Sequence, residues 1–171
     1  YSELAITDRN SFAGIVRGHA AAKKTGMRII PACRLDLLDG PGLLAYPTDK
    51  NAYAQISALL SAGNLRAEKG ECHLYKADVY LYAKDTKFIV LPPAALNASF
   101  DYEDSFKHSL KEYRDIFGKD LYLSASRQYN GHDAKQLHRL FQLSQSLQIP
   151  MVATNDVYYH DPSRRELQDI L

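Results

Sequence analysis

The chain has 171 residues and a mass of 19.3 kDa, the size of a single domain. With 46% hydrophobic and 24% charged residues it has a globular composition, which excludes collagen-like, low-complexity and wholly disordered chains. Its net charge of +1 gives no strong overall field that would attract nucleic acid or a membrane surface.

The two cysteines and the hydropathy pattern exclude further classes. Cys33 and Cys72 have no C-x-x-C spacing, so neither a zinc ribbon nor a disulfide framework is expected, and cytoplasmic localisation is predicted. No apolar run approaches about 18 residues, so no membrane partner is expected.

Short apolar runs in the sequence alternate with stretches of helical periodicity. Branched and aromatic residues fill the short runs, which predict buried and mostly parallel strands at residues 4–7, 28–30, 88–91, 121–123 and 151–154. Apolar residues three and four positions apart predict helices within residues 12–20, 52–60, 106–117 and 137–141. Asp49 and Asp101 are predicted to start the second and third of these helices. The sum is an α/β fold whose sheet is open or closed into a barrel.

Two regions break this alternation. Residues 35–46 contain two extended runs around a turn at 39–42, which predicts an antiparallel hairpin as an excursion from the main sheet. Residues 63–71, with two glycines and four charged side chains, are predicted to form a solvated loop.

Both ends of the sequence predict a chain that is truncated at each terminus. It begins at Tyr1 without Met and enters an apolar run within a few residues. The helical pattern of residues 164–171 has no Gly, Asn or Pro stop signal.

Functional groups of parallel α/β folds gather where the strands end, because the following loops emerge on one face. The residues at these positions include Asp8, Arg9, Arg34, Ser124 and Asp156. Of these, only Asp156 and Asp8 could be metal ligands, and two carboxylates without a histidine are too few for a multinuclear metal site. The glycine-rich dinucleotide loop, the phosphate loop of nucleotide hydrolases and the serine nucleophile elbow are all missing from the sequence.

Residues 7–16, 20–23 and 153–159 resemble the PHP (polymerase and histidinol phosphatase) domain of bacterial C-family DNA polymerases, the α subunits of DNA polymerase III. Residues 8–10, 67–74 and 164–171 resemble the error-prone branch of that family more than the replicative one. The resemblance implies one PHP domain over residues 1–171, with a distorted (β/α)7 TIM-like barrel that is incomplete. Its first strand, which carries a His-x-His ligand pair in the family, would lie before Tyr1.

The resemblance also implies that the family's metal site is degenerate here. Arg9 stands where metal-binding members have a histidine, and Arg34 stands in place of a glutamate. Near residue 94, where members have Cys or His, the nearest match is Ala94, and Tyr158 replaces the histidine of a late Asp-x-His motif in which Asp156 is kept.

Two guanidinium groups convert a cation site into one that carries about two positive charges, because Arg stays protonated. We therefore expect no metal and no catalytic residue in this chain, and an ion pair of Arg9, Arg34 or both with Asp156 and Asp8. An anion or phosphate site on the two arginines is the alternative, since the guanidinium fork suits oxyanions.

The expected function is that of the N-terminal PHP domain of an error-prone DNA polymerase III α-like DNA polymerase, acting in replication, damage-induced mutagenesis and repair. The domain itself is expected to be inactive and to contact the other polymerase domains, with DNA bound through the full-length protein. By resemblance, the parent polymerase uses Mg, whereas metal-binding PHP domains use Zn or Mn. Self-association is also expected, because a missing strand exposes two strand edges. The alternatives are an active metal-dependent PHP phosphoesterase or proofreading exonuclease, and a plain interaction module for neighbouring domains.

Overall fold

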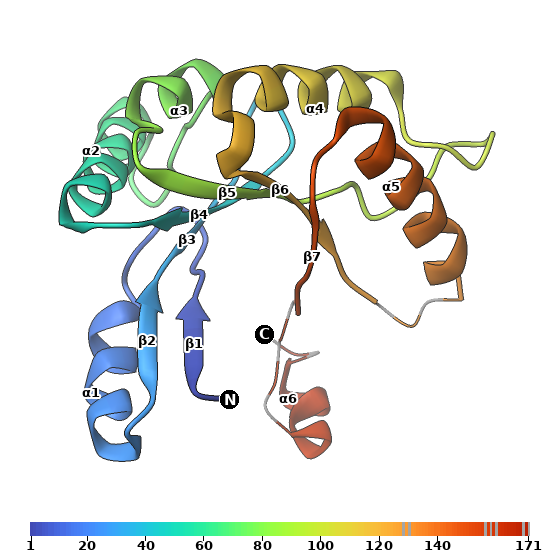
Figure 1. The fold of residues 1–171 in the computed structure, drawn as a ribbon. Coiled ribbons are helices and arrows are strands. Elements are labelled where there is room, and N and C mark those ends of the chain that lie inside the picture. The colour runs from blue at the N-terminus through green and yellow to red at the C-terminus, as the bar shows by residue number, and fades with distance from the viewer. Residues whose placement is uncertain are drawn as a thin grey trace.

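The structure is a computed structural model that describes residues 1–127, 129, 131–155, 157, 159, 161–168 and 170. Over this part of the chain, the strands form one two-stranded and one five-stranded sheet (Figure 1). The strands are β1 (Glu3–Ile6), β2 (Arg28–Pro31), β3 (Cys33–Leu35), β4 (Leu43–Pro47), β5 (Thr86–Val90), β6 (Leu121–Ala125) and β7 (Met151–Ala153). The α-helices are α1 (Ile15–Thr25), α2 (Lys50–Arg66), α3 (Lys76–Tyr82), α4 (Asp104–Phe117), α5 (Asp133–Leu147) and α6 (Arg165–Gln168), with 3-10 turns at Gly118–Asp120 and Pro162–Arg164. The prediction of a mixed α/β fold is confirmed.

The first two strands and α1 form a separate β-α-β unit. β1 pairs with β2 in parallel, and α1 connects them (Figure 1). Gly18 of α1 faces β1, where a Cβ would clash with the end of the Ile6 side chain. The predicted helix begins later than expected, at Ile15, because Phe12 leaves the helical pattern and packs its ring 4.7 Å from the ring of Tyr53.

The hairpin predicted at residues 35–46 forms, but it is not an excursion from the main sheet. β3 and β4 pair in antiparallel fashion, and β4 then pairs with β5 along its whole length, from Leu43 opposite Val90 to Pro47 opposite Thr86. Leu43, Leu44 and Ala45 are all buried, so side chains on both faces of β4 are covered, as in an interior strand. The hairpin therefore supplies two of the five strands in the order β3-β4-β5-β6-β7, and the parallel strands β6 and β7 complete the sheet.

Helices α2, α3, α4 and α5 lie along one side of this sheet (Figure 1). The core between them is aromatic and aliphatic: Phe88 of β5 stacks on Phe117 of α4 with the ring centroids 4.4 Å apart, and Tyr113 is fully buried beside them. Burial of such rings is a main source of stability for a domain of this size.

The two helix starts predicted from aspartates have different outcomes. Asp49 caps α2 as expected, because its carboxylate accepts the Ala52 N–H at 2.8 Å. The start predicted at Asp101 is wrong. Helix α4 begins at Asp104, and the Asp101 carboxylate instead accepts the Tyr102 N–H and pairs with Lys107 at 2.9 Å.

The loop predicted at residues 63–71 begins later, because α2 continues to Arg66. Gly63 is a packing residue of this helix: a Cβ there would meet the Leu74 side chain at 2.5 Å and Sγ of Cys72 at 2.7 Å. Helix α3 was not predicted, although Asp78 carries a local signal for it, since its carboxylate accepts the Tyr75 N–H at the helix start.

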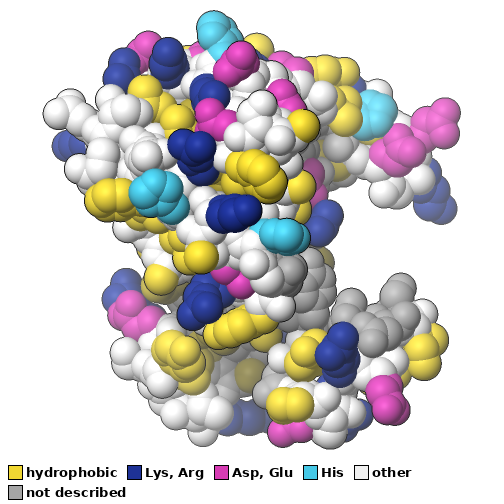
Figure 2. Space-filling model, turned by 90° about the vertical axis from the view of Figure 1, so that its right-hand side faces the viewer, with side chains coloured by type: hydrophobic (Ala, Val, Ile, Leu, Met, Phe, Trp, Pro, Cys, Tyr) yellow, Lys and Arg dark blue, Asp and Glu magenta, His cyan; other side chains and the backbone are white. Residues whose placement is uncertain are grey.

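Positive and negative side chains are interspersed on the face that Figure 2 shows, in keeping with the small net charge. None of the helices in the described ranges has the length and apolar character needed to cross a bilayer.

Candidate functional site

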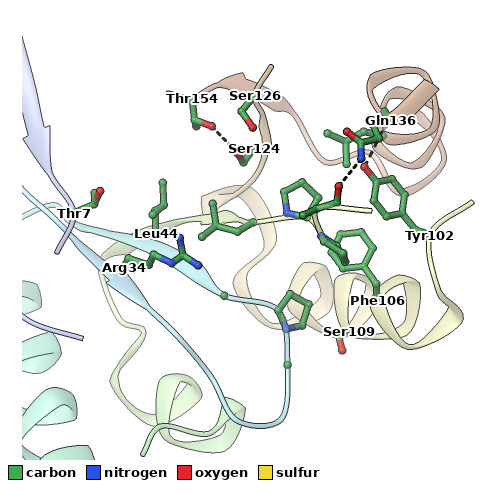
Figure 3. Close-up of a pocket in the computed structure, with 18 of the residues that line it drawn as sticks. Thr7, Arg34, Leu44, Tyr102, Phe106, Ser109, Ser124, Ser126, Gln136 and Thr154 are labelled. Atoms are coloured by element: carbon green, nitrogen blue, oxygen red, sulfur yellow. Dashed lines mark hydrogen bonds between the residues drawn. The ribbon is translucent and has the colours of Figure 1, made fainter. Parts of the chain in front are cut away.

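A cavity of about 790 Å³ opens at the carboxyl ends of the strands (Figure 3). Groups that follow β1, β3, β5, β6 and β7 line it, which is the face where the sequence predicts the functional groups. Its lining includes Thr7, Arg9, Arg34, Pro92, Pro93, Ala94, Ser124, Ser126, Thr154 and Asn155. The hairpin tip at residues 39–42 and side chains of α4 and α5 complete the walls.

Arg9 and Arg34 meet at one carboxylate, that of Asp36. Arg34 donates from Nε to Oδ1 of Asp36 at 2.7 Å, and Nη1 of Arg9 lies 3.4 Å from Oδ2 of the same side chain. The Arg34 side chain is 24% exposed and the Arg9 side chain is 63% exposed. The contact of Arg34 is therefore the shorter and the better shielded of the two.

Backbone hydrogen bonds fix this arrangement by joining the β1 segment to β3. The Arg34 N–H donates to the Asp8 carbonyl at 3.0 Å, and the Asn10 N–H donates to the Arg34 carbonyl at 2.7 Å. The side chain of Asn10, a residue with a φ of 47°, then accepts the Asp36 N–H at 2.9 Å. Asn tolerates this left-handed conformation better than most residues. The N-terminal β-α-β unit is thus attached to the five-stranded sheet beside the two arginines.

The ion pair predicted between the arginines and Asp8 is not formed. Oδ2 of Asp8 accepts the Gly14 N–H at 2.6 Å, at the residue before α1, so this carboxylate holds the start of the helix. Asp156 and Tyr158, the other predicted site residues, lie outside the described residues. The sequence reasoning missed Asp36, although side chains two residues apart on a strand share a face and Asp36 follows Arg34 at that spacing.

Cys33, the residue before Arg34, is fully buried, and its Sγ lies 3.5 Å from the Asp8 carbonyl oxygen. Burial is the main cause that raises the pKa of its thiol to about 12. A protonated thiol is a poor metal ligand, because the thiolate is the form that binds metal.

Among the residues that the structure describes, the side chains at this cavity do not form the ligand set of the metal that the PHP resemblance implies. Arg9 and Arg34 occupy two of the expected ligand positions, and the Asp36 carboxylate between them is already shared by two cations. Across the ranges that the structure describes, no three His, Cys, Asp or Glu side chains come together in a group able to hold a metal ion.

Hydroxyl groups line the wall formed by β6 and β7. Oγ of Ser124 and Oγ1 of Thr154 are 2.5 Å apart, and Ser126 lies beside them (Figure 3). On the far side, the Gln136 amide donates to the Ala94 carbonyl at 2.5 Å and fixes the loop after β5 to α5. The cavity therefore joins a cationic edge to a hydroxyl-bearing wall.

Comparison with known proteins identifies relatives by sequence. The chain is 44% identical over 169 residues to an error-prone DNA polymerase of Caulobacter vibrioides, a match that covers 98% of this chain and 15% of the polymerase. It is 38% identical to error-prone DNA polymerase 2 of Rhizobium meliloti and to the error-prone DNA polymerase of Brucella abortus, over 98% and 99% of this chain. The chain thus spans about 15% of the length of the relatives that it matches. No family model matches the chain.

Solved structures share the fold at low sequence identity. A proposed metal-dependent phosphoesterase from Bifidobacterium adolescentis matches with a TM-score of 0.59 and 13% identity, over 91% of this chain and 77% of that chain. An amidohydrolase from Chromobacterium violaceum, which holds sulfate and no metal, matches with a TM-score of 0.60 and 11% identity, over 95% of this chain and 78% of that chain. The expected resemblance to error-prone DNA polymerases is confirmed: nearly the whole chain is similar to one segment of these polymerases, and its fold is similar to that of the two solved structures.

The Arg34–Asp36 and Arg9–Asp36 ion pairs differ in exposure to solvent, which predicts unequal contributions to the free energy of unfolding. In double-mutant cycles with Arg34→Met, Arg9→Met and Asp36→Ala, we expect a coupling of about 1 kcal/mol between Arg34 and Asp36 and less than about 0.3 kcal/mol between Arg9 and Asp36. Free energies of unfolding from urea denaturation provide the measurement. Equal couplings, or a stronger Arg9 pair, would contradict the geometry.

Burial of Cys33 predicts a loss of stability at alkaline pH. The unfolded thiol loses its proton near pH 9 and the folded thiol only near pH 12, so deprotonation stabilises the unfolded chain between these values. From pH 9 to about pH 11, the free energy of unfolding should fall by about 1.4 kcal/mol per pH unit more in the wild type than in Cys33→Ala. Denaturation curves at a series of pH values measure this difference, and parallel pH profiles for the two proteins would refute it.

Proposed function

We propose that this chain is the PHP domain of an error-prone DNA polymerase III α-like protein and serves there as a metal-free structural domain. Its relatives are named error-prone DNA polymerases, and the matched segment is a small part of each of them. The parent protein would be a DNA-directed DNA polymerase of damage-induced mutagenesis and repair. The carboxylates that hold its Mg²⁺ ions would belong to another part of that protein.

The observation that carries the metal-free proposal is the pair of guanidinium groups that share Asp36. Both remain protonated at any working pH, so a divalent cation placed between them would be repelled. Asp8 forms no ion pair with either arginine, and its carboxylate accepts the Gly14 N–H instead.

The structural role that we propose is to join the N-terminal β-α-β unit to the larger sheet. The hydrogen bonds among Asp8, Asn10, Arg34 and Asp36 tie segments that are more than 20 residues apart in the sequence. A rigid domain of this kind would present its outer surface to the other domains of the polymerase, which are its expected partners, and DNA would be bound through the whole protein.

An active PHP phosphoesterase or proofreading exonuclease is the second candidate. It is favoured by the likeness to a proposed metal-dependent phosphoesterase and by the open cavity at the carboxyl ends of the strands. The side chains at the ligand positions argue against it, since Arg9 and Arg34 cannot coordinate a cation.

Metal content separates the two candidates. The full-length protein, purified without chelator, should contain zinc and manganese far below one ion per chain, and the Asp156→Ala variant should contain the same amount. Neither protein should hydrolyse a phosphodiester when manganese or zinc is added, whereas DNA synthesis with Mg²⁺ should be retained. Stoichiometric metal that is lost in Asp156→Ala, together with metal-dependent turnover, would establish the enzyme and overturn the structural proposal.

A further inference from the structure

The guanidinium group of Arg34 is only partly used by its ion pair. Within the described part of the chain, its side chain donates one hydrogen bond, from Nε to Asp36. An Arg side chain carries five N–H donors in a planar fork, so the terminal nitrogens retain donors for a further acceptor. Arg34 lines the cavity, with its guanidinium group between Leu44 and the open space in Figure 3.

The group formed by Arg9, Arg34 and Asp36 carries a net positive charge. Arg9 and Arg34 share the single carboxylate of Asp36, so the three side chains together carry about one positive charge. Asp39 also lines the cavity, but it lies at the hairpin tip, where one of its oxygens accepts the Lys76 N–H at 2.8 Å.

The opposite wall supplies neutral donors. Ser124 and Thr154 have two hydroxyl protons between them, and their mutual hydrogen bond uses one. Among the described residues no acceptor binds the other proton, and Ser126 and Thr7, which also carry hydroxyl groups, line the same cavity. A volume of about 790 Å³ lies in the range of small-molecule sites, so the cavity has room for more than a lone ion.

From these observations we propose that the cavity is a phosphoryl-binding site, in which Arg34 and Arg9 hold the phosphate oxygens and the hydroxyl groups of β6 and β7 contact the rest of the ligand. Arg favours phosphate because two parallel N–H groups match two oxygens of the anion. The site binds without catalysis, since its positive groups take the place of a metal and the described lining offers no group positioned as a general base. This proposal goes beyond the structural role proposed above, because it assigns a ligand to the cavity.

The phosphoryl group could be free, carried by a mononucleotide, or present at the end of a DNA strand, and the experiment tests each source. Hydrogen exchange of the full-length protein, kept in chelator, is followed by mass spectrometry for peptides that cover residues 32–36, 121–127 and 151–155. The probes are inorganic phosphate, dAMP, and one oligonucleotide with and without a 5′-phosphate, with chloride at matched ionic strength as the reference.

We expect a phosphate probe to slow exchange in these peptides and chloride to leave it unchanged. Arg34→Gln should raise the apparent dissociation constant at least tenfold, and Arg9→Gln, at a more exposed position, about threefold. Arg17→Gln is the matched control, because it removes the same charge from an exposed position of α1 outside the cavity, and it should bind like the wild type.

The preferred probe identifies the source of the phosphoryl group. Protection by dAMP or inorganic phosphate alone would assign a small ligand, and protection that requires the 5′-phosphate of the oligonucleotide would assign a strand end. The inference is overturned if no phosphate probe protects these peptides beyond chloride, or if Arg9→Gln, Arg34→Gln and Arg17→Gln all bind like the wild type. Because metal content is measured separately, loss of this site would leave the structural proposal standing.

Discussion

The carboxylate of Asp36 is the contact on which the candidate site depends. It pairs with Arg34 at 2.7 Å and with Arg9 at 3.4 Å, and the Asp36 N–H donates to Oδ1 of Asn10. Without this carboxylate, two like charges would face one another at the edge of a sheet, which is unfavourable in a partly shielded environment. One acidic side chain thus makes it possible for two arginines to lie where the PHP resemblance implies metal ligands, while backbone hydrogen bonds of Arg34 with Asp8 and Asn10 join the two sheets beside it.

Much of the fold follows from local patterns. Strands β2, β5, β6 and β7 and helix α2 with its Asp49 cap could be predicted, because apolar periodicity and capping act over a few residues. Strands β5 and β6 are largely buried as expected, whereas no residue of β2 or β7 is buried. The position of the β3–β4 hairpin in the main sheet could not be predicted from the local sequence pattern. It depends on pairing between β4 and β5, which are about 40 residues apart. The late start of α4 follows from the contacts of the Asp101 carboxylate with the Tyr102 N–H and Lys107, whereas Gly63 is buried because α2 packs there against Leu74 and Cys72.

The sequence predicted the position of the site correctly but only part of its side-chain contacts. Arg9, Arg34 and Ser124 line one cavity because parallel strands bring their carboxyl ends together, as the sequence indicates. The predicted pairing of the arginines with Asp8 was wrong: Asp8 accepts the Gly14 N–H at the start of α1, while Asp36 contacts both guanidinium groups. The predicted pairing with Asp156 lies outside the described residues. Side-chain partners of this kind depend on the register between β1 and β3, which residue spacing alone does not determine.

A crystal structure of the full-length protein grown with zinc or manganese, with anomalous scattering recorded at the metal edge, tests the central claim most directly. The account predicts that Asp36 lies between Arg9 and Arg34, with no anomalous peak at the carboxyl ends of the strands. A metal ion at this position coordinated by Asp156, with the arginines turned away from Asp36, would contradict it.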